Sequence, residues 1–258
     1  MLRFRSLGSG SAGNATVVEA CSGASVTRVL VDCGLGIRTM ERRLGQAGLR
    51  TGDIDAIFIT HEHGDHMGCA RAVALRERIP VWMSHGTWLA HGEADFDGLL
   101  HTARHDEPIE CGNLRLHPFA VPHDAREPLQ LTCTDGASRL GVLTDLGHAT
   151  ALVLAQLAHC QALLLECNHD PDLLAASGYP AFLKRRVGGT HGHLANAQAA
   201  EILQTVQHDS LRHVVAAHLS ARNNSPAHAR AALAGARNCA EEDILVADAM
   251  LGTEWLRV

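Results

Sequence analysis

The sequence of 258 residues lacks several features that mark whole classes of protein. No stretch approaches the roughly 18 consecutive apolar residues of a membrane-spanning helix. Residues 1–7 alternate like a strand and contain no apolar signal-peptide core, so we expect a cytoplasmic protein with no membrane partner. Aromatic residues make up only 3% of the chain, which leaves alanine and leucine to fill much of the interior.

Neither a disulfide framework nor a basic surface is indicated. The eight cysteines contain no Cys-x-x-Cys pair, and in a cytoplasmic protein we expect them to be reduced. The chain has 22 basic and 28 acidic residues, and its formal net charge of -6 argues against a simple electrostatic nucleic-acid binder. No proline-rich or glycine-rich linker divides it. We therefore expect residues 1–258 to form a single domain.

Apolar periodicity predicts strands and helices in both halves of the chain. Strands are expected at residues 2–7, 15–19, 27–32, 55–59, 114–121, 129–134, 139–144, 162–166 and 213–218. Helices are expected near residues 37–47, 68–78, 150–158, 180–187, 196–206 and 226–234. Residues 92–112, which include His101 and His105, are expected to be a long loop, either a lid over a site or a surface insertion. This arrangement favours two sheets with helices outside.

The segment from Thr60 to His66 is the most informative part of the sequence. It contains His61, His63, Asp65 and His66 directly after an apolar strand, so we expect these residues to lie in a loop at the strand end. Imidazole nitrogens and a carboxylate oxygen suit zinc and similar metals. Because the chain has 18 histidines, a chance cluster is the alternative. Four residues of metal-ligating types lie at one strand end, and Gly64 is expected to give the turn its conformational freedom. This arrangement favours a metal site.

Three further candidate ligands follow other apolar strands. His123 follows residues 116–121, Asp145 follows residues 139–144, and His218 follows residues 214–217. Each of these alone would be best explained as a polar residue that caps a strand or a helix. Together with the first segment, they indicate a centre with enough ligands for two metals.

The order His-x-His-x-Asp-His, then His, Asp and His resembles that of the metallo-β-lactamase superfamily. The resemblance implies an α/β fold, a four-layer αββα sandwich, with two divalent metal ions, Zn²⁺ or alternatively Mn²⁺ or Fe²⁺. It also implies the ligands: His61, His63 and His123 for one metal, Asp65, His66 and His218 for the second, and Asp145 as the bridge.

Further motifs make the chain similar to the bacterial WalJ/YycJ group of small phosphodiesterases and exonucleases. They are residues 6–14 (SLGSGSAGN), 121–125 (VPHDA), 166–170 (ECNHD), 178–180 (GYP), 183–186 (LKRR), 192–196 (GHLAN), 217–220 (AHLS) and 223–224 (NN). The chain departs from the group at Cys167, where serine is usual, and at Ala195, where serine is common.

The resemblance implies a dinuclear metal-dependent hydrolase, above all a phosphodiesterase or nuclease that attacks DNA or RNA with a hydroxide bridging the metals. Asp65 is expected to orient or deprotonate that water, and His193 to protonate the leaving oxygen. Local packing at a helix entry is the alternative for His193, and His169 is a weaker candidate. Substrate contacts are expected from Ser9, Ser11, Lys184, Arg185, His193 and Asn196. The basic run at residues 184–186 is the best candidate for contact with backbone phosphates, and a solvated helix face is its alternative.

Other functions remain open at this point. A thioester or lactone hydrolase similar to glyoxalase II is one, and the acidic net charge keeps it open. A non-catalytic, metal-stabilised protein that holds a nucleotide in the turn at residues 8–13 is another. A secreted β-lactamase is disfavoured because no signal peptide is expected. A flavodiiron protein is disfavoured because the remaining length does not fit a flavin domain. The expected partner is nucleic acid or another phosphodiester, and a homo-oligomer is compatible with the sequence.

Overall fold

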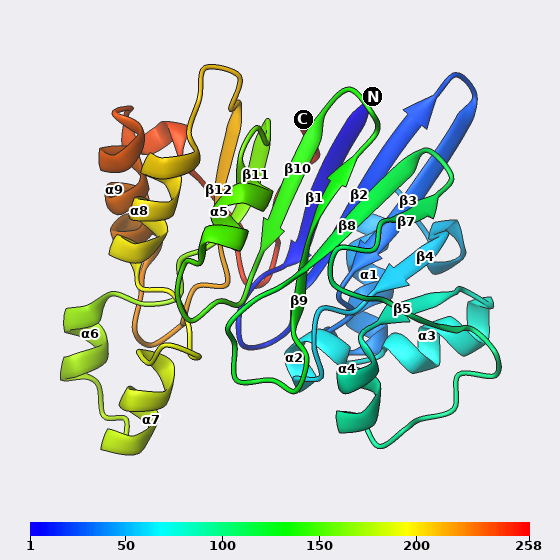
Figure 1. The fold of residues 1–258 in the computed structure, drawn as a ribbon, viewed down its shortest axis with the longest axis horizontal. Helices are drawn as coiled ribbons and strands as arrows, with labels where there is room; N and C mark the ends of the chain where they lie inside the picture. The colour runs from blue at the N-terminus through cyan, green and yellow to red at the C-terminus, as the bar shows by residue number, and fades with distance from the viewer.

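Two seven-stranded sheets face each other in the computed structural model, which describes residues 1–258 (Figure 1). The first sheet has the order β14-β1-β2-β3-β4-β5-β6. Its strands are β1 (Leu2–Gly8), β2 (Ala15–Ser22), β3 (Ser25–Val31), β4 (Ala56–Phe58), β5 (Val81–Met83), β6 (Leu100–Thr102) and β14 (Leu256–Arg257). The second sheet has the order β13-β12-β11-β10-β9-β8-β7. Its strands are β7 (Ile109–Cys111), β8 (Leu114–Ala120), β9 (Leu129–Thr134), β10 (Arg139–Leu143), β11 (Ala162–Glu166), β12 (His213–Ala217) and β13 (Leu245–Val246).

Helices cover the outer faces of both sheets (Figure 1). On the first sheet they are α1 (Ile37–Gln46), α2 (Gly64–Met67), α3 (Ala70–Glu77) and α4 (His85–Ala90). On the second sheet they are α5 (Ala151–Leu157), α8 (Asn196–Val206) and α9 (Pro226–Arg237). Helices α6 (Pro171–Ala176) and α7 (Ala181–Val187) lie beyond the strand ends (Figure 1). The expected four-layer αββα sandwich is confirmed. None of these helices has the length and apolar character needed to cross a bilayer.

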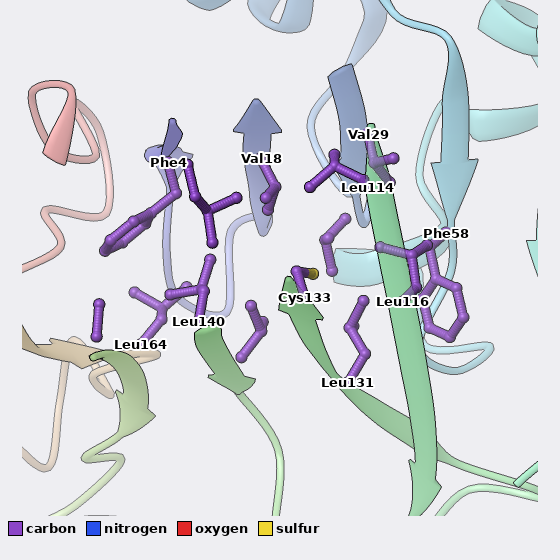
Figure 2. Close-up of a cluster of buried hydrophobic side chains, with 14 of the residues drawn as sticks. Phe4, Val18, Val29, Phe58, Leu114, Leu116, Leu131, Cys133, Leu140 and Leu164 are labelled. Carbon is purple, nitrogen blue, oxygen red and sulfur yellow. The ribbon is translucent and has the colours of Figure 1, made fainter. Parts of the chain in front are cut away.

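The hydrophobic core lies in three layers, as a four-layer fold requires. One cluster fills the space between the sheets, where Phe4 and Val18 of the first sheet face Leu131 and Leu140 of the second (Figure 2). The other two clusters lie between each sheet and its helices. The central cluster joins residues from both halves of the chain, which supports the proposal that residues 1–258 form one domain.

One edge of the sandwich collects the carboxyl ends of many strands. In the first sheet, β3, β4, β5 and β6 run parallel, and in the second sheet β10, β11, β12 and β13 do. Strand β8 has the same direction as β10, because both are antiparallel to β9. Polar residues that follow these strands are therefore brought to the same side of the molecule.

The prediction of a long loop at residues 92–112 is wrong. This segment contains β6 and β7, the edge strands through which the chain crosses from the first sheet to the second. His101 stacks on Trp82 of β5, with 4.7 Å between the ring centroids. Three-residue edge strands carry too little periodicity to be recognised in the sequence, and the same holds for β5, β13 and β14. Helices α4 and α6 were also not expected.

A buried carboxylate ties the first three strands together on their outer face. Glu19 lies opposite Arg3 in β1 and Arg28 in β3, and its oxygens accept hydrogen bonds from them at 2.6 and 2.7 Å. Burial of Glu19 raises the pKa of its carboxyl, but the bonds from Arg3 and Arg28 outweigh burial and leave that pKa below its ordinary value. The ion-paired form is thus part of the folded state.

We predict that Glu19→Gln lowers the free energy of unfolding at pH 7 by about 2 kcal/mol, because it removes two charge-assisted hydrogen bonds. Since the folded-state pKa is depressed, this contribution is complete above the unfolded value of about 4.3 and is lost as the pH falls below it. Urea titrations from pH 7 downward would show the difference between wild type and variant shrinking. The matched control is Glu254→Gln, because the side chain of Glu254 is 87% exposed. A difference that did not change with pH would contradict the account.

Candidate metal centre

The first sheet delivers four candidate ligands to the shared edge through one short segment. His61 and His63 follow β4, and Asp65 and His66 lie in α2. The expectation of a loop throughout this segment is therefore corrected, since its second half is one helical turn. Gly64 has open space around its Cβ position and an ordinary φ, so the turn does not depend on it.

The close approach that needs glycine is made at Gly34 and Gly68. A Cβ on Gly34 would lie 1.7 Å from the carbonyl oxygen of Asp65. A Cβ on Gly68, which has a φ of +35°, would lie 2.5 Å from the carbonyl oxygen of Cys33. These two glycines let the backbone of the turn after β3 pack in direct contact with the backbone of α2. This contact fixes the position of Asp65 and His66 relative to the first sheet.

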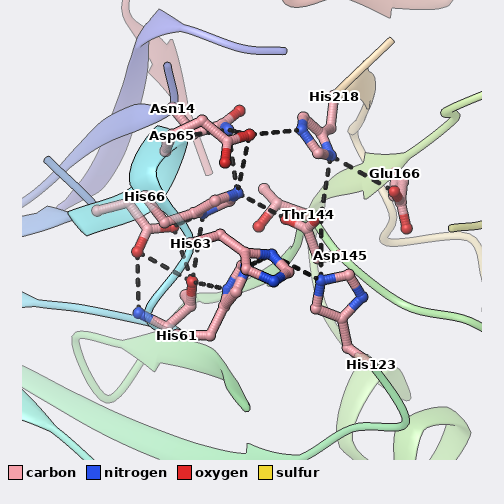
Figure 3. Close-up of polar contacts among 12 residues, drawn as sticks. Asn14, His61, His63, Asp65, His66, His123, Thr144, Asp145, Glu166 and His218 are labelled. Atoms are coloured by element: carbon pink, nitrogen blue, oxygen red, sulfur yellow. Dashed lines mark hydrogen bonds and ion pairs between the residues drawn. The ribbon is translucent and has the colours of Figure 1, made fainter. Parts of the chain in front are cut away.

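The second sheet delivers the remaining candidates from four strand ends. His123 follows β8, Asp145 follows β10, Glu166 ends β11 and His218 follows β12. Figure 3 shows these side chains converging with those of the first sheet. All seven predicted metal ligands thus lie within one cluster.

Three histidines form one compact set of donors. The Nδ1 atom of His63 lies 3.0 Å from Nε2 of His61 and 3.3 Å from Nε2 of His123. The ligand atoms of these three residues all lie within 4.8 Å of one another. Burial lowers the pKa of His61 and His123, which keeps lone pairs available for a cation at neutral pH.

Asp65, His66 and His218 form a second set with the same compactness. An oxygen of Asp65 lies 3.4 Å from Nε2 of His218 and 3.7 Å from Nε2 of His66. Asp145 lies beside this set, with its oxygens 2.9 Å from His66 Nε2 and 3.1 Å from His218 Nδ1. It is also 3.9 Å from Nε2 of His123, so one carboxylate adjoins both sets.

The electrostatics of the cluster fit bound cations. Both oxygens of Asp145 and both ring nitrogens of His218 are buried and lack a hydrogen bond of acceptable geometry. Burial lowers the pKa of His66, but Asp145 and Asp32 outweigh it and raise that pKa to about 10. The buried carboxylates therefore demand positive charge at this point, and divalent ions with this donor set would supply it.

Backbone strain marks two positions in the centre. Asp32 and His218 both follow strands and have φ values of +60° and +53°, in the left-handed region that non-glycine residues avoid. Such conformations persist where the surrounding structure fixes them, and they cluster at functional sites. The strain turns both side chains back toward the cluster.

Asp32 holds the candidate ligands in place from behind. Its carboxylate accepts from Nδ1 of His66 at 2.8 Å and from the backbone N–H of Thr60 at 2.9 Å. The Thr60 hydroxyl in turn lies 3.0 Å from Nδ1 of His61. These contacts leave the Nε2 atoms of His66 and His61 facing the centre. On the other side, the amide of Asn14 contacts the carbonyl of Asp65 at 3.2 Å.

His193 lies at the mouth of the centre, 22% exposed, and is held by two carboxylates. Its Nδ1 atom is 2.7 Å from Glu166 Oε1 and 3.1 Å from Asp145 Oδ1. Burial lowers the pKa of His193, but these carboxylates outweigh burial and raise it to about 9. The ring therefore carries a proton at neutral pH and is held rigidly.

A cavity of about 370 Å³ opens over the centre. Its lining includes Ser11, Asp65, Arg186 and His193. Arg186 comes from α7 and is paired with Asp124, whose other oxygen lies 3.4 Å from Nε2 of His123. A guanidinium thus faces the same space as the candidate ligands.

The predicted substrate residues are distributed unequally around this cavity. Ser11 and His193 line it, whereas Ser9, Lys184, Arg185 and Asn196 do not. The hydroxyl of Ser9 accepts from the N–H of His218 at 2.8 Å, and Asn196 pairs with Asn224. The N–H of Gly10 donates to Asn14 Oδ1, so that amide is not free for an anion. Their roles toward substrate remain predictions.

Two residues of the site were missed in the sequence: Asp32 and Glu166. Asp32 and Glu166 stand at the ends of apolar strands, which is the pattern that identified Asp145, and they could have been found by applying it to every strand. Arg186 is the member of the basic run 184–186 that faces the cavity, and the sequence could not single it out, because only the packing of α7 decides this. His169 lies outside this cavity.

The chain matches known proteins over most of its length. Residues 27–219 match the model of the β-lactamase superfamily domain. The exodeoxyribonuclease YycJ of Bacillus anthracis is 31% identical over 89% of this chain and 86% of its own length. The exodeoxyribonuclease WalJ of Streptococcus pneumoniae is 28% identical over 86% of this chain and 83% of its own. Among solved structures, the metallo-β-lactamase fold protein YhfI of Bacillus subtilis superposes with a TM-score of 0.76 at 15% identity, over the full length of both chains.

We predict that Asp32→Asn weakens metal binding about 10- to 100-fold while the protein stays folded, since it removes the charge that orients His66. Asparagine tolerates the left-handed backbone at this position. Competition between the protein and a chromogenic zinc chelator would measure the change. Asp55→Asn is the matched control, because Asp55 stands next to a strand of the same sheet, directly before β4, and its side chain accepts only from the N–H of Arg28. Equal affinities for both variants would refute the role of Asp32.

Proposed function

The chain belongs to the β-lactamase superfamily, and on this premise we propose that it is a two-metal phosphodiesterase that degrades DNA from an end. It is an enzyme, a metal-dependent hydrolase. The observation that carries the proposal is the pair of three-residue donor sets on either side of the buried Asp145. The names of its relatives, which are exodeoxyribonucleases, support DNA as the substrate.

The proposed ligands are those of the two sets. His61, His63 and His123 would hold one ion, and Asp65, His66 and His218 the other, with Asp145 shared between them. When bound, two divalent ions lower the pKa of water toward about 7 and neutralise the charge that develops on a phosphodiester. The donors suit Zn²⁺, with Mn²⁺ and Fe²⁺ as alternatives.

Asp65 is proposed to orient the attacking water. Its side chain is 25% exposed and lines the cavity, in contrast to the buried Asp145. One of its oxygens is fixed between His66 and His218, so the carboxylate is held in a single orientation. It can therefore accept a proton from water that enters the cavity.

His193 is proposed to donate the proton that the leaving oxygen needs. The alkoxide of a sugar is a poor leaving group, so protonation contributes strongly to the rate. Glu166 and Asp145 hold Nδ1 of His193 from one side. This leaves the opposite edge of the ring, with Nε2, for the substrate.

Arg186 and Ser11 are proposed to bind the phosphate that is cleaved. Both line the cavity, from α7 and from the turn between β1 and β2. An arginine in this position can replace its bond to Asp124 with a bidentate bond to phosphate oxygens. The cytoplasmic location and a homo-oligomer stay predictions.

The proposal is tested by incubating metal-loaded protein with DNA labelled at one end or the other. We expect metal-dependent release of nucleotides from one end, which also gives the direction of cleavage. Attack on RNA alone would revise the substrate. Hydrolysis of thioesters or lactones without attack on any phosphodiester would replace the proposal by the glyoxalase II-like alternative, and no hydrolysis at all would indicate a binding protein.

We predict that Asp65→Ala lowers turnover of bis(p-nitrophenyl) phosphate and of DNA at least about a hundredfold, because the water loses its orienting carboxylate. Circular dichroism and the thermal midpoint should remain those of a folded protein. Unchanged turnover in this variant would refute the proposed site.

We predict that His193→Ala lowers cleavage of DNA about a hundredfold but cleavage of bis(p-nitrophenyl) phosphate much less. The p-nitrophenolate ion leaves without a proton, whereas a sugar oxygen does not. His191→Ala is the matched control, since His191 is exposed and does not line the cavity. Equal losses on both substrates would contradict a role for His193 as the proton donor.

A further inference from the structure

A second pocket lies on the far side of α7 from the metal centre. Leu183, Arg186 and Val187 line the metal cavity, whereas Lys184, Arg185 and Gly188 line this second pocket. Residues three and four apart share a helix face, so α7 presents one face to each space. The second pocket, here called the outer pocket, is open and has a volume of about 680 Å³.

The charge of the outer pocket is the opposite of that of the chain. The protein has a net charge of -6, yet no acidic residue lines the outer pocket. Two cationic side chains do, Lys184 and Arg185, and Lys184 is the only lysine in the sequence. The ammonium of Lys184 also donates to the carbonyl of Ala175, which fixes α7 against α6.

The amino terminus of α8 opens into the same pocket. Its cap residue, Ala195, has no side-chain oxygen, so the N–H groups of Ala197 and Gln198 have no side-chain cap. All three residues line the outer pocket. The first turn of a helix carries partial positive charge and free N–H donors, which together attract an anion.

His169 supplies an independent observation that points to a ligand of the outer pocket. Its side chain lines the pocket, the residue is only 3% exposed, and its Nδ1 atom has no hydrogen-bond partner. Its Nε2 atom lies 3.8 Å from the position of a Cβ on Gly188, at the carboxyl end of α7. A buried polar nitrogen without a partner is costly, and a ligand that accepted its proton would remove that cost.

We propose that the outer pocket binds a second phosphate of the DNA strand whose scissile phosphate lies at the metal centre. This inference rests on the proposed function and assigns a subsite to it. Helix α7, about 10–12 Å across with its side chains, would separate the two phosphates and contact both, Arg186 on one side and Lys184 with Arg185 on the other. The N–H groups of α8 and the imidazole of His169 complete the phosphate site.

The experiment compares binding of metal-loaded, full-length protein to a labelled single-stranded DNA of about 12 nucleotides, measured by fluorescence anisotropy. The DNA has phosphorothioate linkages, which resist cleavage. One variant is Lys184→Gln with Arg185→Gln. The other is Ala197→Asp, which places a negative charge in the pocket while favouring the first turn of α8. Arg104→Gln is the matched control, because Arg104 is exposed and pairs only with Glu107.

We expect both pocket variants to weaken binding about tenfold or more, with the control within about twofold of wild type. The double variant should also reduce the slope of log K against log salt by about 0.7, the value for one phosphate contact on a single strand. The thermal midpoint of Ala197→Asp should not fall, which separates loss of binding from loss of structure.

Three results would overturn the inference: no binding of DNA by wild type at low salt, pocket variants that bind like the control, or weakening by the double variant without any by Ala197→Asp. The last result would indicate only a basic surface. Cleavage is not needed for this measurement, so a protein that bound DNA as expected but did not cut it would contradict the proposed function and leave the subsite standing.

Discussion

The structure depends on the placement of one carboxylate, Asp145, in the interior between two groups of histidines. A buried charge is strongly destabilising unless opposite charge lies beside it. In this protein the compensating groups come from both sheets: His66 is 2.9 Å away and His218 is 3.1 Å away. Since the two histidines can be protonated or can bind cations, the same geometry that makes Asp145 tolerable also makes the centre a place for divalent metals. The strand ends, the left-handed backbone at Asp32 and His218, and the close packing at Gly34 all serve to hold this arrangement.

Around this centre, the residues that position other side chains are buried, and the residues proposed to contact substrate are accessible from the cavity. The carboxylates that position other side chains, Asp32 and Glu166, are buried behind the histidines they contact. The groups proposed to touch substrate, Asp65, His193 and Arg186, all line the cavity. Helix α7 extends this division outward, because none of its residues is buried and it stands as a wall between the metal cavity and the outer pocket. Substrate specificity is therefore expected to lie in α7 and its surroundings, and the chemistry in the strand ends.

Much of the fold and the metal cluster could be predicted from the sequence, because both follow local rules. Apolar strands ending in His or Asp identified His61, His123, Asp145 and His218, and parallel strands bring such ends together. The short strands β5, β6, β7, β13 and β14 could not be predicted, since their pairing is decided by neighbours far away in the chain. The environment of Lys184, Arg185 and Arg186 could not be predicted either. Three adjacent basic residues look alike in sequence, and only the orientation of α7 about its own axis assigns Arg186 to one space and the others to another. The roles assigned to these residues remain proposals.

The measurement that tests the central claim most directly is a crystal structure of the metal-loaded protein with anomalous diffraction data collected at the absorption edge of the bound metal. The account predicts two anomalous peaks about 3.5–4 Å apart, one contacted by His61, His63 and His123 and the other by Asp65, His66 and His218, with Asp145 between them. A single peak would contradict the account, because one of the two donor sets would then hold no metal. Peaks only elsewhere in the molecule would contradict it too, because the charge of Asp145 would then be balanced by protons on the surrounding imidazoles alone.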